Sequence, residues 1–198
     1  HLPTGCVALG QRVVDVKPGS VILESGMQVE ADRVVVATEG PVAGELLELP
    51  HVGSKAVSCV WYSAERAPHT KKLIALDGTA LGPGLNVAVL SNVAPEYAPN
   101  GGAVIAVACP GAWGDDLEPS VRRQLVAWFG ADVDGWRHLR TDTIAHAQPD
   151  QTPPTNPRQV VSLGERLFVC GDHRDTASIQ GALVSGRRCG EAVVASLV

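Results

Sequence analysis

Short runs of apolar residues, separated by turns, fill the first forty positions. Residues 13–16 precede a Lys-Pro-Gly-Ser turn, "VILES" forms a second run, and Gly26-Met27 turns the chain again before "QVEADRVVVAT". This spacing of runs and turn residues is typical of antiparallel strands. Residues 34–37 are continuously apolar, which suits a strand covered on both faces. Residues 11–38 therefore predict a three-stranded meander that leads into a central, parallel strand.

The pattern changes between about residues 51 and 150. After a short helix that starts near Pro41, the runs "KAVSCVWYS", "KKLIALDG", "LNVAVLSNV" and "GGAVIAVACP" are separated by Gly, Pro and Asn turns. They predict an antiparallel sheet. Apolar residues spaced as on one helix face predict a helix over 117–129. Residues 139–145 alternate as a further strand, and a Pro-rich connector then leads to the last apolar run, 167–170.

The C-terminal stretch "LFVCGDHRDTASIQGALVSGRRCGEAVV" combines a buried strand, an acidic loop and a long helix. Gly171-Asp172 places a carboxylate at the carboxyl end of a sheet, where open α/β folds bind ligands. Ser178 is the expected N-cap of a helix from about residue 179, whose first backbone N–H groups favour negative charge nearby. On the pattern alone, an ordinary strand–turn–helix with Asp172 in a turn is the favoured interpretation.

Small residues recur along this helix. Ala182, Gly186 and Gly190 are four residues apart, and we expect this stripe to let the helix lie close to a sheet or a flat ligand. Gly181 is expected to leave room for an approaching ring, because it carries no Cβ. His173, between Asp172 and Arg174, lacks the spacing of a metal site, so we expect it to be solvated in a loop.

Composition narrows the classes of protein. The chain has 198 residues, 45% of them apolar and 19% charged, which is enough for a folded core. The net charge of -5, without a cluster of Lys or Arg, argues against a nucleic-acid partner. No apolar run is long enough for a transmembrane segment. Five scattered cysteines without a CxxC pair predict buried free thiols, no metal site and a reducing intracellular compartment, with plastid and cytosol both open.

Taken together, three stretches resemble the flavin-dependent amine oxidoreductases, which include amine oxidases, protoporphyrinogen oxidase and phytoene-desaturase-type enzymes. Residues 11–38 resemble the meander that ends in "VVvAt", "IAHAQPD" resembles the segment before the return crossover, and residues 167–193 resemble the C-terminal flavin motif. The resemblance implies an α/β fold. Residues 1–50 and 151–198 would be part of an FAD-binding Rossmann-like domain of the glutathione-reductase type. Residues 51–150 would be an inserted antiparallel-sheet-plus-helix substrate domain.

The resemblance also implies FAD as the cofactor and a set of residues that hold it. Val13 would contact the adenine through its backbone, and Asp172, after Gly171, would bind the ribityl or pyrophosphate region. A helix start beside the N1–C2=O edge of the flavin would stabilise the negative charge of the reduced ring. The residues that would line the isoalloxazine ring are Gln180, Gly181, Ala182 and Leu183. Neither the motifs nor the resemblance identifies a catalytic residue.

Some positions depart from the family pattern. No stretch fits the GxGxxG fingerprint, so the sequence predicts an N-terminal companion segment or another protein chain as partner. Glu39 stands where many relatives have Pro, and Ser58 stands where amine oxidases have a lysine that supports a water at flavin N5. The aromatic cage of those oxidases is not evident either. These departures favour dehydrogenation of an apolar substrate, such as a tetrapyrrole or isoprenoid, over amine oxidation.

Two functions remain open at this point. The chain is either the C-terminal half of an FAD-dependent oxidoreductase that moves a hydride from an organic substrate to flavin, or a non-catalytic, truncated flavoprotein-like subunit or scaffold in a larger assembly. In both cases such a half would expose unpaired sheet edges, so we expect it to be unstable as an isolated monomer.

Overall fold

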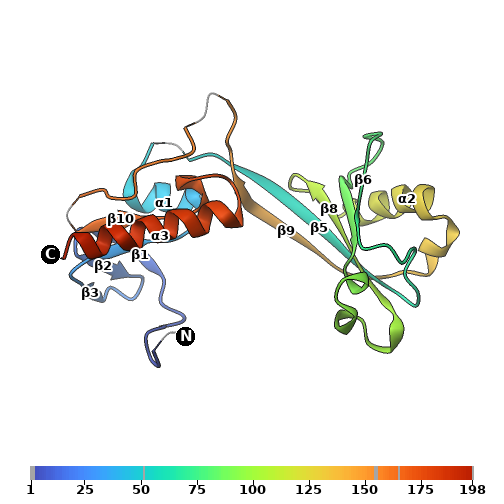
Figure 1. Cartoon of the computed structure of the whole chain (residues 1–198), viewed down its shortest axis with the longest axis horizontal. Coiled ribbons are helices and arrows are strands. Elements are labelled where there is room, and N and C mark those ends of the chain that lie inside the picture. The colour runs from blue at the N-terminus through green and yellow to red at the C-terminus, as the bar shows by residue number, and fades with distance from the viewer. Residues whose placement is uncertain (1–2, 51, 154–155, 165, 198) are drawn as a thin grey trace. The chain divides into compact units, whose positions relative to one another are not determined.

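The computed structural model describes residues 3–50, 52–153, 156–164 and 166–197. Its contacts divide the chain into two compact units (Figure 1). Unit 1 comprises His1–Ser54 with Gln148–Val198, and unit 2 comprises Lys55–Ala147. The fold is the mixed α/β architecture that the sequence predicts. The FAD-binding and substrate-binding roles of the two parts stay a prediction.

Unit 1 begins with the predicted meander. Strands β1 (Val13–Lys17), β2 (Ser20–Leu23) and β3 (Gln28–Glu30) pair antiparallel in that order. Gly19, with φ of +86°, occupies the turn between β1 and β2, where its backbone conformation disfavours any residue with a side chain. The chain then enters β4 (Val34–Val36), which pairs in parallel with β10 (Leu167–Val169) from the far end of the sequence. Both the meander and the parallel strand are therefore confirmed.

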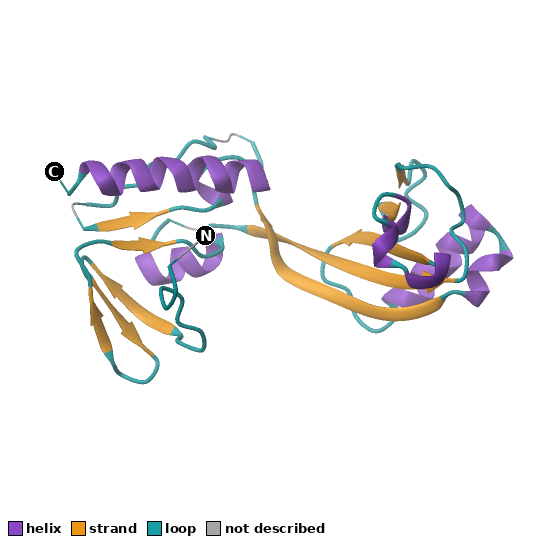
Figure 2. Cartoon of the chain, turned by 60° about the horizontal axis from the view of Figure 1, so that its bottom comes forward, coloured by secondary structure: helices purple, strands orange, loops and turns teal. Residues whose placement is uncertain are grey.

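One helix packs on each face of the β4–β10 pair (Figure 2). On one face, Val36 and Val169 pack with Ala43 of α1 (Gly40–Leu47), which has Pro41 in its first turn as predicted. On the other face, Phe168 packs with Cys189 of α3 (Ile179–Ala195). The second edge of β10 pairs with residues 161–163, since the Val169 N–H donates to the Val161 carbonyl. Strand β10 is thus paired on both sides and buried.

Strand β4 does not have the cover that its sequence predicts. Val34 and Val36 are buried, but Val35 is 43% exposed and Ala37 is exposed as well. Val35 lies opposite Phe168 and shares its face of the sheet. Helix α3 buries Phe168 and leaves Val35 open. The prediction of a central strand covered on both faces is therefore wrong for this chain, because in the described residues β10 is the one strand beside β4.

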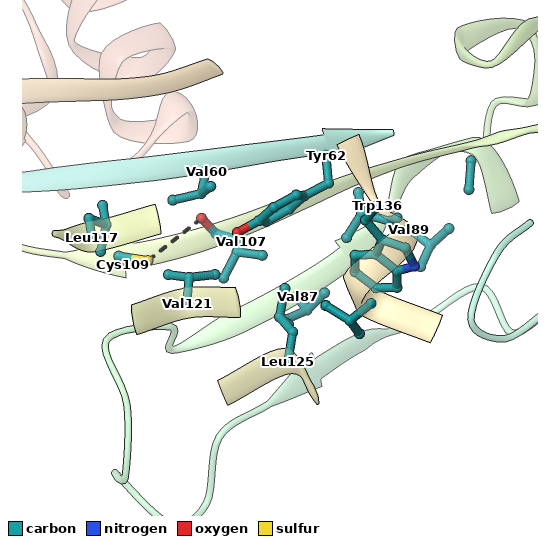
Figure 3. Packing of buried hydrophobic residues seen from close by; sticks show 13 residues of the cluster. Val60, Tyr62, Val87, Val89, Val107, Cys109, Leu117, Val121, Leu125 and Trp136 are labelled. Atoms are coloured by element: carbon teal, nitrogen blue, oxygen red, sulfur yellow. Dashed lines mark hydrogen bonds between the residues drawn. The ribbon is translucent and has the colours of Figure 1, made fainter. Parts of the chain in front are cut away.

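Unit 2 is a five-stranded sheet with one long helix. The strand order is β6–β7–β8–β5–β9, and β6, β7, β8 and β5 pair antiparallel with their neighbours, as predicted. Figure 3 shows its core, where Val121 and Leu125 of the helix pack with Tyr62 and Trp136. The Arg122 guanidinium lies 5.2 Å from the centre of the Tyr62 ring. The elements are β5 (Ser54–Ala64), β6 (Ile74–Leu76), β7 (Asn86–Val89), η1 (Leu90–Asn92), η2 (Pro95–Tyr97), η3 (Pro99–Gly101), β8 (Ala103–Pro110), α2 (Leu117–Phe129), η4 (Ala131–Gly135) and β9 (Arg137–Pro149).

The structure also tests the predictions for the cysteines and for a transmembrane segment. All five cysteines are free thiols; Cys109 and Cys189 are buried, but Cys6 is exposed, which contradicts the expectation that all are buried. Cys6 precedes the first strand and has no core to enter. Within the described residues, no helix is both long and apolar enough to cross a membrane, and no group of three His, Cys, Asp or Glu side chains could hold a metal.

Candidate functional site

The turn at the end of β10 is fixed tightly to the last helix. Ser185, fully buried in α3, accepts the Gly171 N–H at 3.1 Å and donates its hydroxyl to the Gly171 carbonyl at 2.6 Å. Gly171 has φ of +151°, and a Cβ there would lie 2.6 Å from the His173 ring and 3.2 Å from the Thr38 carbonyl. Only glycine fits this turn, and Ser185 sets its position against α3.

Asp172 follows at the start of a short 3-10 helix, η5 (Asp172–Arg174). Its backbone carbonyl accepts the Asp175 N–H at 3.1 Å. The side chain is half-buried and makes no hydrogen bond or ion pair with any described residue. A partly desolvated carboxylate without a partner at the carboxyl end of a strand is available to accept hydrogen bonds from a ligand.

The start of α3 lies beside this turn, because α3 packs on η5. Ser178 is the N-cap, as predicted: its Oγ accepts the Gly181 N–H at 3.0 Å, and its carbonyl accepts the Ala182 N–H at 3.0 Å. The backbone N–H groups of Ile179 and Gln180 have no acceptor among the described residues. The Gln180 amide, which was expected to face the flavin, is therefore free to donate to a ligand. The Ile179 amide is a second such donor.

The loop between η5 and α3 is held by residues that the sequence analysis did not identify. The Gln151 side chain donates to the Asp175 carbonyl at 2.6 Å and accepts the Ala177 N–H at 3.0 Å. Arg188 pairs with the Asp175 carboxylate at 3.1 Å, with both side chains 16% exposed. Gln151 lies in the Pro-rich connector, and no spacing in the sequence links that connector to the loop.

The surface at the start of α3 is apolar and exposed. Ile179 is 83% exposed and Leu183 65% exposed, and Gln180 and Ala182 are exposed with them. The residues expected to line the isoalloxazine ring are therefore on the surface, with the exception of buried Gly181. An exposed apolar group beside two unpaired amides suits a flat ligand with a polar edge.

The small residues of α3 differ from expectation at Gly181 and in which face packs on the sheet, whereas a flat ligand against the predicted stripe stays a prediction. The space beside Gly181 is filled by the Thr176 backbone, which a Cβ would overlap, so the glycine accommodates the chain itself and not a ring. The helix face that packs on the fold carries Gly181, Ser185 and Cys189. Gly186 and Gly190 have nothing within 4 Å of a Cβ. The predicted stripe is displaced by one residue from the packed face, because small size alone does not show which side of a helix is buried.

His173 is not the solvated loop residue that we expected. It is 8% exposed, and neither ring nitrogen has a hydrogen-bond partner in the described structure. Burial, followed by the positive charge of Arg174, lowers the pKa of the imidazole, and Asp172 opposes the shift. Its polar neighbours in "GDHRD" suggested exposure, but the tight turn at Gly171 directs the ring inward.

Two further predicted positions lie elsewhere. Val13 is half-buried at the first position of β1, an edge strand of the separate three-stranded sheet. Ser58 is fully buried in unit 2, where its hydroxyl donates to the Gly111 carbonyl at 3.0 Å, contacts Thr143 Oγ1 at 3.1 Å and accepts the Trp113 N–H at 3.3 Å. Ser58 thus has a structural role within its own sheet.

Comparison with known families decides the identity of the fold. The model of the flavin-containing amine oxidoreductases matches residues 2–194, which is nearly the whole chain. The chain belongs to this family. The predicted family and its FAD cofactor are confirmed at this level. No curated protein matches the chain.

Several solved structures share the fold of this chain. The PF1083 protein from Pyrococcus furiosus aligns with a TM-score of 0.65 at 10% identity, covering 93% of this chain and 46% of that one. Putrescine oxidase bound to putrescine aligns with a TM-score of 0.61 at 12% identity, covering 93% and 48%. An oxidoreductase from Methanosarcina mazei aligns with a TM-score of 0.59 at 12% identity, covering 91% and 48%. The chain spans about half the length of these structures.

The described residues fit part of an FAD site. Asp172 offers an unpartnered carboxylate, and the start of α3 offers two unpaired amides beside exposed apolar side chains. These groups suit a ligand that has hydroxyl groups, an aromatic ring system and a negatively polarised edge, as FAD has. The assignment of individual residues to parts of the cofactor stays a prediction.

Proposed function

We propose that this chain provides one half of an FAD-dependent oxidoreductase, in which a hydride passes from an organic, apolar substrate to the flavin. One observation carries the proposal. In a member of a flavin-containing family, the Asp172 carboxylate and the backbone amides of Ile179 and Gln180 lie in neighbouring elements, and none of them has a hydrogen-bond partner among the described residues. When bound, the flavin supplies the hydride acceptor.

The chain's own residues would bind and orient the cofactor. The Asp172 carboxylate would accept hydrogen bonds from hydroxyl groups of the ribityl chain. The amides of Ile179 and Gln180, at the positive end of the α3 dipole, would lie against the polar edge of the ring and stabilise negative charge there. Leu183 would cover the ring and exclude water. Ser178 and Gly181 keep this helix start in place through the N-cap.

The open edge of β4 supports a companion segment as partner. The Val34 N–H donates to the Arg166 carbonyl and the Val36 carbonyl accepts the Cys170 N–H, so both face β10. The backbone groups of Val35 then face away from β10, because successive residues of a strand alternate in direction. An unpaired parallel edge with a half-exposed valine suits one more strand and a layer over it. We propose that the N-terminal half of the enzyme supplies both.

The substrate class rests on the sequence and on Ser58. A serine replaces the lysine that supports a water in amine oxidases, and its hydroxyl is already used by Gly111 and Trp113. This favours dehydrogenation of an apolar substrate over amine oxidation. A reducing intracellular compartment, plastid or cytosol, remains part of the proposal.

The first experiment measures the flavin content of the protein purified from its native source, with the mass of every copurifying chain. The oxidised cofactor absorbs near about 375 and 450 nm. In the chain produced together with its companion, Asp172→Ala should weaken FAD binding about tenfold or more, because a hydrogen bond to a charged group is worth about 1.5–3 kcal/mol. Asp134→Asn, at an exposed position of unit 2, is the control. Equal flavin content in the two variants would show that Asp172 does not bind the cofactor.

The companion segment is tested with a matched pair of variants. Val35 is 43% exposed on β4 and Val29 is 41% exposed on β3, the outer strand of the meander. Val35→Lys should abolish copurification of the companion, whereas Val29→Lys should leave it unchanged. A protein without flavin or companion, in its native source, would favour the alternative of a non-catalytic subunit.

A further inference from the structure

A cavity of about 540 Å³ lies within unit 1, against η5. Its wall combines the chain after α1 with the connector that follows β9. None of the residues that the resemblance assigns to FAD lines it. The volume falls in the range of small-molecule sites, about 300–1,000 Å³. Its apolar lining includes Leu49, Val52, Val160 and Leu163, and its polar lining includes His173 and Arg174.

His173 brings two unsatisfied ring nitrogens to this cavity. The side chain is more than nine-tenths buried, at 8% exposure, and neither nitrogen has a partner in the residues that the structure describes. Gly40 and Gly171 pack against the ring closely enough that a Cβ at either would contact it. The ring is therefore fixed in place. A buried imidazole that is fixed and unpaired costs free energy unless a ligand or water completes its hydrogen bonds.

Arg174 brings a buried positive charge to the same cavity. It is 8% exposed, and its Nε and Nη2 both donate to the carbonyl of Val160. No described carboxylate lies within ion-pair distance of its guanidinium. Burial, and then the positive charge of Arg188, lowers its pKa, and no acidic group opposes them. A buried guanidinium is ordinarily paired with an anion, because the charge is expensive to desolvate alone.

The nearby carboxylates do not supply that anion. Asp175 is paired with Arg188 at 3.1 Å. Asp150, which also lines the cavity, is exposed, and its Oδ1 accepts the backbone N–H and the hydroxyl of Thr152 at 3.2 and 2.6 Å. The positive charge of Arg174 and the unpaired ring of His173 therefore meet in one cavity without a described counter-charge on the guanidinium.

From this juxtaposition we propose that the cavity binds a small organic anion, with its carboxylate or phosphate headgroup on Arg174 and His173 and its apolar body against Leu49, Val52 and Leu163. An anionic oxygen would accept from the remaining guanidinium N–H groups and from one imidazole N–H. None of the residues that line this cavity is one of the proposed flavin contacts.

The test uses three probes on the full chain, purified with any companion that it carries. Benzoate has the proposed charge and an apolar body, benzamide is its neutral counterpart, and inorganic phosphate has the headgroup alone. Binding is followed through the imidazole resonances of isotope-labelled histidine, with His173 assigned by His173→Asn. We expect benzoate or phosphate to shift the His173 resonances, with benzamide at least about tenfold weaker than the anion that binds. Which anion binds identifies the headgroup.

Arg174→Gln should weaken binding of that anion about tenfold or more, whereas Arg187→Gln, on the exposed face of α3, should leave it unchanged. If Arg174→Gln does not fold, the direct response of His173 in the unaltered protein still decides. The proposal is overturned if neither anion moves the His173 resonances, or if benzamide binds as tightly as benzoate and phosphate does not bind. A cavity already filled by an acidic side chain of a companion would leave His173 unresponsive, and would overturn it too.

Discussion

Two glycines of the same helix allow the packing of α3 to be tested by one substitution each. In Gly181→Ala the new Cβ would overlap the Thr176 backbone, whereas in Gly186→Ala it would meet nothing within 4 Å. Both changes raise the helix propensity by the same amount, which stabilises the helix by about 1 kcal/mol. Only Gly181→Ala adds a steric cost, about 1–3 kcal/mol for a methyl group in a filled site. The difference between the variants is therefore this steric cost.

The assay follows local opening of α3 through the thiol of Cys189. This side chain is 1% exposed, and burial raises its pKa to about 11, so it reacts with an alkylating reagent when the helix opens. A difference of about 1–3 kcal/mol predicts labelling about 5-fold to about 150-fold faster in Gly181→Ala than in Gly186→Ala. Cys109, buried in unit 2 with a pKa raised by burial to about 12, is the internal control.

Mass spectrometry of the labelled peptides separates Cys189 from its half-exposed neighbour Cys170. Equal labelling of Cys189 in the two variants would refute the packing argument. It would show that the Thr176 backbone does not fill the space beside Gly181, and that the glycine is open to a ligand after all. Faster labelling of Cys109 in Gly181→Ala would indicate general unfolding, and the comparison would then be made in a shorter labelling pulse.

Three further predictions follow from the same structure. Ser178→Ala removes the cap from the Gly181 N–H, and we expect α3 to lose about 1 kcal/mol, measured by the same Cys189 labelling. Because the pKa of His173 is lowered in the folded state, the unfolded state binds more protons below the ordinary pKa of about 6.5. The unfolding free energy should therefore fall as the pH drops below that value, and His173→Asn should flatten its dependence in urea titrations. Ser58→Ala leaves the Trp113 N–H and the Gly111 carbonyl without their buried partner, so tryptophan fluorescence should report a loss of about 1–3 kcal/mol in unit 2; an unchanged midpoint would contradict this.

Much of the fold is predictable from the sequence, because its signals are local. Turn residues and apolar runs predict the meander, the antiparallel sheet and the helix over 117–129, and Ser178 is correctly predicted as an N-cap. Each of these depends on neighbours within a few residues along the chain. The C-terminal motif likewise predicts the family, since its length makes chance resemblance improbable.

The contacts that hold the candidate site are not predictable in this way. Gln151 reaches Asp175 across 24 residues of sequence, and Ser185 fixes Gly171 across 14. His173 is buried although its neighbours in the sequence are charged. In each case the partner comes from a different element, so burial and pairing depend on the tertiary fold and not on the local pattern.

The places where the sequence prediction is wrong support the proposal of a companion. A continuously apolar β4 predicts cover on both faces, and the small residues at 182, 186 and 190 predict close packing. In this chain Val35 is half-exposed, and Gly186 and Gly190 have no close neighbour. Val35 and helix α3 lie on the same side of the sheet, since Phe168 opposite Val35 packs on Cys189. One partner that covers that side would explain both the apolar sequence of β4 and the small residues of α3. Val35→Lys should then release the companion and expose the Gly186–Gly190 face to solvent.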